Sequence, residues 1–156
     1  MKPRLSRLAL PLLALALLVG PLAAALPGAA LAQTGAEDLY NSARDMLQRS
    51  DYASAIDGFS RAIGADPNLV NAYVGRATAY VYEGNPQAAL QDFNRALELD
   101  PNMAEALYNR GVLLSQTGDV QGAIRDLQRA AEVFRQRGDE QTAGMVSQVI
   151  NQLQQQ

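Results

Sequence analysis

Apolar and small residues recur with a period of 34 from about residue 36 onward. The clearest registers are Ala55, Ala89 and Ala123; Phe59, Phe93 and Leu127; and Ala62, Ala96 and Ala130. Within a unit the apolar positions follow helical spacing, as at Tyr73, Ala77 and Tyr80, so that they share one face of an amphipathic helix. Each unit has room for two such stretches, and the pattern therefore predicts three consecutive pairs of helices.

Capping residues and prolines mark the boundaries of these helices. Asp51, Asn85 and Asp119 are in register and are suited to cap the second helix of each unit. Pro67 and Pro101 close the first two units, because proline lacks the N–H that would continue a helix. The predicted helices span residues 36–49, 52–65, 69–83, 86–99, 103–116 and 119–137.

A seventh helix is predicted after the third unit. Gly138 provides a stop for the preceding helix, and Asp139 can cap the next one. The apolar stripe of this last helix consists of Val146, Val149, Ile150 and Leu153. A stack of helical repeats needs such a lid, since the last repeat otherwise exposes its stacking face. We expect the acidic pairs Glu37-Asp38 and Asp139-Glu140 to lie at helix N-termini, where negative charge is favourable.

The repeat resembles the tetratricopeptide repeat (TPR) family, whose pattern places an aromatic residue, Leu-Gly, Tyr, Ala, Phe, Ala and a closing Pro at fixed offsets. In the second unit the residues that carry the resemblance are Tyr73, Ala77, Tyr80, Ala89, Phe93, Ala96 and Pro101. The resemblance covers about residues 36–137. Two departures are the absence of the family's leading Trp, replaced by Leu39, Tyr73 and Leu107, and of its Leu, replaced by Ser42, Arg76 and Arg110.

This resemblance implies an all-α fold, a right-handed helical solenoid of three helix-turn-helix repeats followed by a C-terminal capping helix. The repeats would span about residues 36–69, 70–103 and 104–137, and the capping helix about residues 139–154. Residues 36–156 would then form one TPR domain.

The first 32 residues have a different character. A basic start with Lys2, Arg4 and Arg7 precedes an apolar run, and small residues ending in Ala30-Leu31-Ala32 follow it. This layout predicts a signal peptide over residues 1–32, cleaved before Gln33, and export by the general secretion route. The destination would be the periplasm, the extracellular space or a thylakoid lumen. The alternative is an uncleaved membrane anchor, because the apolar character continues toward Ala25.

Charge and composition exclude several classes of function. Beyond the N-terminal segment, 10 basic residues face 16 acidic ones, so that phosphate backbones and anionic lipid would be repelled. The sequence has no Cys and no His, which removes disulfides, the usual zinc ligands and Ser-His or Cys-His nucleophile pairs. We therefore predict no enzymatic activity, no metal, no cofactor and no nucleic-acid partner.

Charged residues also occur in pairs at the repeat period. Arg76 and Arg110 interrupt the apolar stripe of the first helix, and Asp92 and Asp126 follow them sixteen residues later. The first unit has Ser42 and Gly58 at the two equivalent positions. We interpret the pairs as structural ion pairs between the helices of a repeat; the alternative is that the arginines bind a ligand.

In the TPR family the first helices of successive repeats line a concave groove, which implies a binding surface here. The candidate residues are those turned away from the packing stripe: Tyr40, Asn41, Arg44 and Gln48; Val74, Thr78 and Tyr82; and Tyr108, Asn109, Val112 and Gln116. Tyrosines with amide groups are suited to holding an extended peptide or another protein's helix.

One branch of the family grips C-terminal carboxylates with Lys, Asn and Arg at set places in this groove. Here those places hold Tyr40, Arg44, Gly75, Glu105 and Asn109. The basic clamp is absent, and a chaperone-tail ligand is not expected. The sequence thus predicts a protein-protein interaction module, an adaptor or scaffold for an unidentified protein or peptide. The alternative is a structural protein that self-associates through its solenoid ends or is tethered to a membrane by a retained N-terminus.

Overall fold

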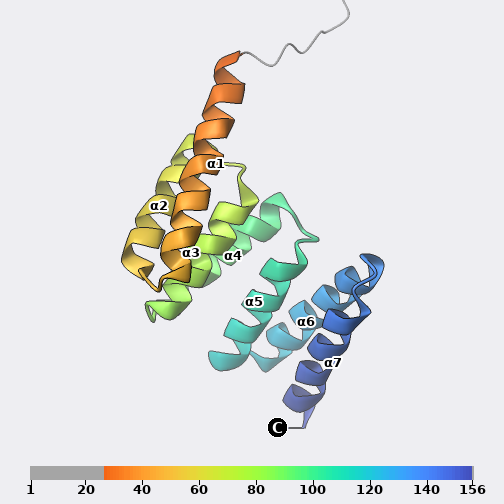
Figure 1. Cartoon of the computed structure of the whole chain (residues 1–156). Coiled ribbons are helices and arrows are strands. Elements are labelled where there is room, and N and C mark those ends of the chain that lie inside the picture. The colour runs from red at the N-terminus through yellow and green to blue at the C-terminus, as the bar shows by residue number, and fades with distance from the viewer. Residues whose placement is uncertain (1–26, 156) are drawn as a thin grey trace, which may run out of the picture.

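The computed structural model describes residues 27–155, and all regular structure in this part of the chain is α-helical. In chain order the helices are α1 (Pro27–Gln48), α2 (Tyr52–Ala65), α3 (Val70–Tyr82), α4 (Pro86–Leu99), α5 (Ala104–Gln116), α6 (Val120–Gln136) and α7 (Glu140–Gln154). The pairs α1–α2, α3–α4 and α5–α6 pack as helical hairpins, and α7 packs on α6 (Figure 1). The predicted all-α solenoid of three helix-turn-helix repeats and a capping helix is confirmed.

The first helix begins earlier than predicted. α1 starts at Pro27 rather than at residue 36, because the Ala- and Leu-containing stretch that follows Pro27 favours a helix and proline is tolerated in a first turn. Glu37 and Asp38 consequently lie within α1, so that the expectation of an acidic pair at its N-terminus was wrong. Residues 1–26 of the predicted signal peptide lie outside the described residues. Among residues 27–155, no helix combines the length and the apolar character needed to cross a membrane.

The predicted caps of the other helices are confirmed. Asp51, Asn85, Asp119 and Asp139 each accept a hydrogen bond from the backbone N–H three residues later. At Asp139 the side-chain and backbone groups of Thr142 hold the pKa of the carboxyl below its usual value. Gly138 has a φ of +78°, which suits glycine and lets the chain turn from α6 into α7. The third repeat therefore ends at a glycine where the first two end at a proline.

Small side chains in the core let the helices approach closely. Ala43, Ala55, Ala77, Ala89 and Ala123 are fully buried. Phe59, Phe93 and Leu127 are also fully buried, at equivalent positions of the three repeats. Each of these large side chains belongs to a separate hydrophobic cluster, and the clusters follow one another along the stack. The core is thus built repeat by repeat, which leaves the junctions between repeats free to differ.

Candidate functional site

The helices form two layers. α1 contacts α3, and α3 contacts α5, so that the first helices of the repeats lie side by side in one layer (Figure 1). α2, α4 and α6 form the other layer. α7 packs on α6, and its residues line a crevice together with residues of α5, so that α7 follows α5 on the side of the first layer.

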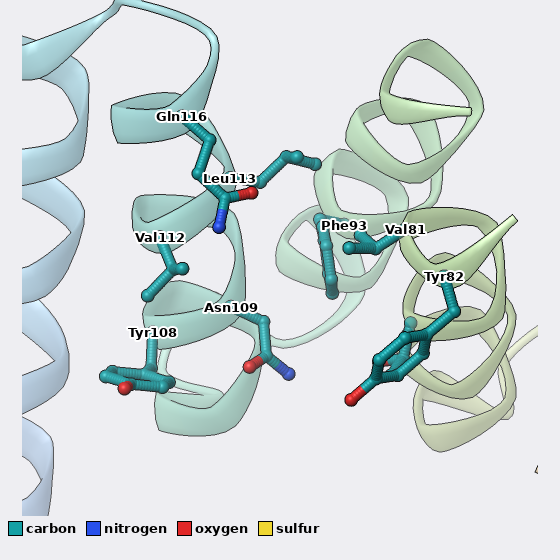
Figure 2. Close-up of a pocket in the computed structure, with 9 residues that line it drawn as sticks. Val81, Tyr82, Phe93, Tyr108, Asn109, Val112, Leu113 and Gln116 are labelled. Atoms are coloured by element: carbon teal, nitrogen blue, oxygen red, sulfur yellow. The ribbon is translucent and has the colours of Figure 1, made fainter. Parts of the chain in front are cut away.

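A crevice lies between α3 and α5 on this layer, with a volume of about 280 Å³. We call it the α3–α5 crevice. Its lining consists of Thr78, Val81, Tyr82, Phe93, Tyr108, Asn109, Val112, Leu113 and Gln116. Figure 2 shows the Tyr82 and Tyr108 rings on opposite sides, with the Asn109 amide between them. Phe93 and Leu113 belong to the buried core, so that the crevice reaches down to it.

A second crevice of about 340 Å³ lies between α5 and α7, and we call it the α5–α7 crevice. Its lining consists of Glu105, Tyr108, Asn109, Phe134, Thr142, Met145 and Val146. Met145 is one of the large apolar side chains that stay exposed. Tyr108 and Asn109 line both crevices, which therefore flank the same turn of α5. Together they make a track across α3, α5 and α7.

The structure divides the predicted groove residues into two groups. Those that line the α3–α5 crevice are Thr78, Tyr82, Tyr108, Asn109, Val112 and Gln116. The others, Tyr40, Asn41, Arg44, Gln48 and Val74, line neither crevice. Val81, Phe93 and Leu113 also line the α3–α5 crevice and were not among the predicted groove residues. The prediction included no residue of α7 either, because that helix was assigned only a capping role.

Two of the predicted groove tyrosines also pack on the core, which corrects the expectation that they turn away from it. The Tyr40 ring lies 5.8 Å from the Phe59 ring, centroid to centroid. Tyr108 is half-buried and packs against two of the hydrophobic clusters. A tyrosine ring is large enough to contact the core from a position that helical spacing assigns to the groove. Helical spacing alone does not reveal such contacts.

Tyr82 behaves differently. Its side chain is 63% exposed, and one face stacks on Tyr52, with ring centroids 5.0 Å apart and an interplanar angle of 10°. The stacked pair ties the end of α3 to the start of α2. Tyr82 is therefore a fixed aromatic wall of the α3–α5 crevice, held by a residue outside it.

The structure brings the predicted charge pairs together. Nε and Nη2 of Arg76 donate hydrogen bonds to the two carboxylate oxygens of Asp92, at 2.7 and 2.8 Å. Hydrogen bonding to Asp92 raises the pKa of Arg76. Arg110 and Asp126 repeat this bidentate geometry at the same distances, 2.7 and 2.8 Å.

Each arginine also reaches back to the preceding repeat, which the sequence analysis missed. Nη1 of Arg76 donates to Oγ of Ser60 on α2, and Nη1 of Arg110 donates to Oδ1 of Asn94 on α4. Ser60 and Asn94 lie sixteen residues before the arginines, a spacing that the sequence displays. Each guanidinium is thus held by partners on two other helices and braces consecutive repeats.

The lining of the two crevices carries almost no charge. Glu105 is the single charged residue among the residues that line them. Its carboxylate is paired with Nη1 of Arg137 at 3.1 Å. Within the described residues, no group of three or more acidic side chains is placed to hold a metal ion. The surface offers aromatic, aliphatic and amide groups, which suit recognition of a polypeptide.

Comparison with known proteins supports the tetratricopeptide resemblance. Residues 74–140 match the family described as tetratricopeptide repeat. This match covers most of the second repeat, the third repeat and the turn into α7. No curated protein matches the sequence.

Solved structures share the fold. The first TPR of Spaghetti (RPAP3) bound to the HSP90 peptide SRMEEVD has a TM-score of 0.70 at 22% identity, covering 77% of this chain and 90% of that chain. The yeast Sti1 TPR2B domain in complex with pHsp70 has a TM-score of 0.72 at 22% identity, covering 77% and 96%.

A bacterial structure is similar to the same extent. The Yersinia enterocolitica type III secretion chaperone SycD, in complex with a peptide of the translocator YopD, has a TM-score of 0.71 at 18% identity, covering 76% and 91%. At these identities the likenesses show the TPR fold of this chain.

Proposed function

We propose that this protein is a non-catalytic interaction module that binds a segment of another protein on the layer formed by α3, α5 and α7. The observation that carries the proposal is the pair of crevices that meet at Tyr108 and Asn109. Their aromatic and amide groups match what polypeptide recognition requires, since a tyrosine ring provides contact area and an amide provides hydrogen bonds.

The solved structures support a peptide-sized ligand. Two of them contain a bound peptide, from HSP90 and from YopD, and the third is a complex with pHsp70. They have the fold of this chain, and a ligand of the same kind would fit a solenoid of this size. The identity of the peptide does not transfer at 18–22% identity.

An acidic chaperone tail is a poor match to this chain. The HSP90 peptide SRMEEVD contains three acidic residues, which positive charge in a binding site would attract. Here the lining of the crevices has Glu105 as its single charged residue, and the exposed Arg44 lies outside both of them. The proposed partner is therefore a protein that presents an uncharged segment.

We further propose that the protein acts after export through the general secretion route, in the periplasm, the extracellular space or a thylakoid lumen. The basic start, the apolar run and the Ala30-Leu31-Ala32 ending support this proposal. Intact-mass analysis of the protein from its native host should find Gln33 as the first residue. Retention of Met1 would instead support the tethered alternative.

Capture experiments with matched variants test the proposed function. Wild-type protein, Tyr82→Ala combined with Tyr108→Ala, and the outer-layer control Arg95→Ala would each be immobilised and exposed to native extract. Because Tyr108 also packs on the core, Tyr82→Ala combined with the exposed Gln116→Ala serves as a second groove variant. We expect both groove variants to lose the proteins that wild type and Arg95→Ala retain. Equal capture by all folded variants would move the binding site away from this layer. Size measurement of the free protein checks self-association.

A further inference from the structure

The first and second repeats meet where α3 packs on α2, and the second and third repeats meet where α5 packs on α4. One of the repeat positions at which these two junctions differ is occupied by Gly75 on α3 and by Asn109 on α5. At the first junction the glycine permits close contact with the preceding repeat. A Cβ atom added at Gly75 would lie only 2.5 Å from Cε1 and Cζ of the Phe59 ring. α2 accordingly packs more extensively on α3 than α4 packs on α5.

Asn109 faces the equivalent ring at the second junction. Phe93 stands where the first repeat has Phe59, and it lies at the floor of the α3–α5 crevice beside Asn109. A side chain at this position would collide with a ring placed as Phe59 is placed against Gly75, and α4 packs less extensively on α5 than α2 packs on α3. Leu113 likewise replaces Ala79 on the same face of the helix. The crevice at the second junction therefore follows from larger residues at two positions.

The chemistry of this crevice restricts what can occupy it. Its lining contains no charged residue, and its volume of about 280 Å³ exceeds the roughly 150 Å³ at which an apolar cavity accommodates a benzene ring. Tyr82 and Tyr108 wall it, and Phe93 forms its floor (Figure 2). These surfaces favour one large apolar side chain, since a charged group would lose its hydration without a partner.

Two amide groups lie beside this opening. Within residues 27–155 the side chains of Asn109 and Gln116 make no hydrogen bond to protein groups, although Asn109 is half-buried. They are seven positions apart on α5, about 10 Å along the helix axis, which is roughly three residues of an extended chain. An extended segment offers unpaired backbone N–H and C=O groups to both amides, whereas a helix has satisfied its own.

We infer that the α3–α5 crevice is the anchor site for one aromatic or aliphatic side chain of an extended, uncharged peptide segment, and that Asn109 holds the crevice open. This inference rests on the proposed function and specifies it further. It assigns the second junction as the binding junction and leaves the first as a purely structural contact. It also makes binding insensitive to salt, because no ion pair contributes.

Capped amino acids provide the probe. N-acetyl-leucine amide and N-acetyl-phenylalanine amide would be titrated into ¹⁵N-labelled protein, with the aspartate and lysine analogues as charged controls. We expect saturable amide shifts at Val81, Leu113 and Gln116 with the apolar probes alone. These shifts should stay the same when the salt concentration is raised roughly ten-fold, from about 0.05 to about 0.5 M. Shifts at the first junction, an equal response to the charged probes, or no saturable shift would overturn the inference.

Two variants test the role of Asn109. Asn109→Gly recreates the residue of the first junction and should weaken apolar probe binding by about ten-fold or more, which is a loss of about 1.4 kcal/mol. Val112→Trp should block the crevice without introducing a helix-weakening glycine, and Gln91→Trp on the exposed side of α4 is its control. Unchanged binding to both crevice variants would contradict the assignment.

The failure of this inference differs from the failure of the proposed function. If the crevice variants lose the apolar probes but keep every protein captured by wild type, the crevice exists but does not anchor the partner, and the inference fails alone. If the groove variants with Tyr82→Ala also keep those proteins, the proposed function fails as well.

Discussion

Arg76 on α3 and Asp92 on α4 are joined by two parallel hydrogen bonds, of 2.7 and 2.8 Å, while the remaining guanidinium nitrogen reaches Ser60 on α2. The same arrangement recurs one repeat later and is missing from the first repeat, where Ser42 and Gly58 occupy the two positions. The brace therefore connects neighbouring repeats as well as the two helices of one repeat. The bidentate ion pairs therefore hold together the helices of the second repeat and of the third repeat. The α3–α5 crevice lies between these two repeats.

A double-mutant cycle measures the strength of this brace. Arg76→Ala or Asp92→Ala alone should cost about 3 kcal/mol of unfolding free energy, the low end of the range for a buried pair, because 20% of the Arg76 side chain is exposed. The double variant should cost clearly less than the sum, and urea denaturation provides all the values. The exposed pair Arg95 and Glu98 is the control and should show no measurable coupling. Additive losses at Arg76 and Asp92 would show that the brace does not stabilise the fold.

Two glycines of α2 give opposite predictions for the same substitution. A Cβ at Gly58 would lie 2.8 Å from Cβ of Ala43, whereas one at Gly64 would meet nothing within 4 Å. Gly58→Ala should therefore lower the unfolding free energy by about 1–3 kcal/mol through overpacking. Gly64→Ala should raise it by about 0.5–1 kcal/mol, because alanine favours a helix. Thermal or urea unfolding of both variants measures the two changes in unfolding free energy. Equal changes would mean that α1 and α2 are not in close contact at Gly58.

The cap of α7 should make stability depend on pH. Hydrogen bonds from Thr142 lower the pKa of Asp139 in the folded protein. A carboxyl with a lowered folded pKa stabilises the protein fully above its unfolded pKa, about 3.9, and loses this contribution as the pH falls through the folded value. Asp139→Asn retains a capping oxygen but does not titrate. The difference in unfolding free energy between wild type and Asp139→Asn should thus shrink between pH 7 and pH 3; a constant difference would contradict this cap.

The groove tyrosines should separate into two classes of stability effect. Tyr108 is half-buried against two clusters, so Tyr108→Ala should open space in the core and cost about 2–3 kcal/mol. Tyr82→Ala removes mainly the stacking on Tyr52 and should cost about 0.5–1.5 kcal/mol. Thermal unfolding of the two single variants provides the comparison. A loss at Tyr82 that equals the loss at Tyr108 would mean that Tyr82 is not a surface ring.

The fold was predictable because the same pattern of apolar and capping residues recurs in every repeat. Helix ends are marked by residues whose backbone or side-chain chemistry stops or starts a helix, namely the N-caps, Pro67, Pro101 and Gly138. Accordingly, α2 and α4 have the predicted bounds. The start of α1 was not predictable to the same degree, because nothing in the stretch after Pro27 signals a boundary. Helix interiors rich in alanine extend until another feature stops them.

The candidate site was predictable only in part. Helical spacing indicates which residues lie opposite the packing stripe, and it led to Tyr82, Asn109 and Gln116. It does not indicate how far apart two helices stand, which depends on whether Gly75 or Asn109 faces a phenylalanine ring. The α5–α7 crevice was not predicted for a related reason, since the position of α7 in the first layer follows from tertiary packing.

Chemical-shift mapping of a bound peptide would show whether the layer of α3, α5 and α7 binds a polypeptide segment. Dodecapeptides would be selected from a random displayed library on the wild-type protein, and the tightest binder titrated into the ¹⁵N-labelled protein. We expect the perturbed amides to lie on α3, α5 and α7, around Tyr82, Tyr108 and Asn109. We also expect the selected sequences to share one large apolar residue among uncharged ones. Perturbations confined to α2, α4 and α6, or selected sequences dominated by acidic residues, would contradict the claim that this layer binds an uncharged polypeptide segment.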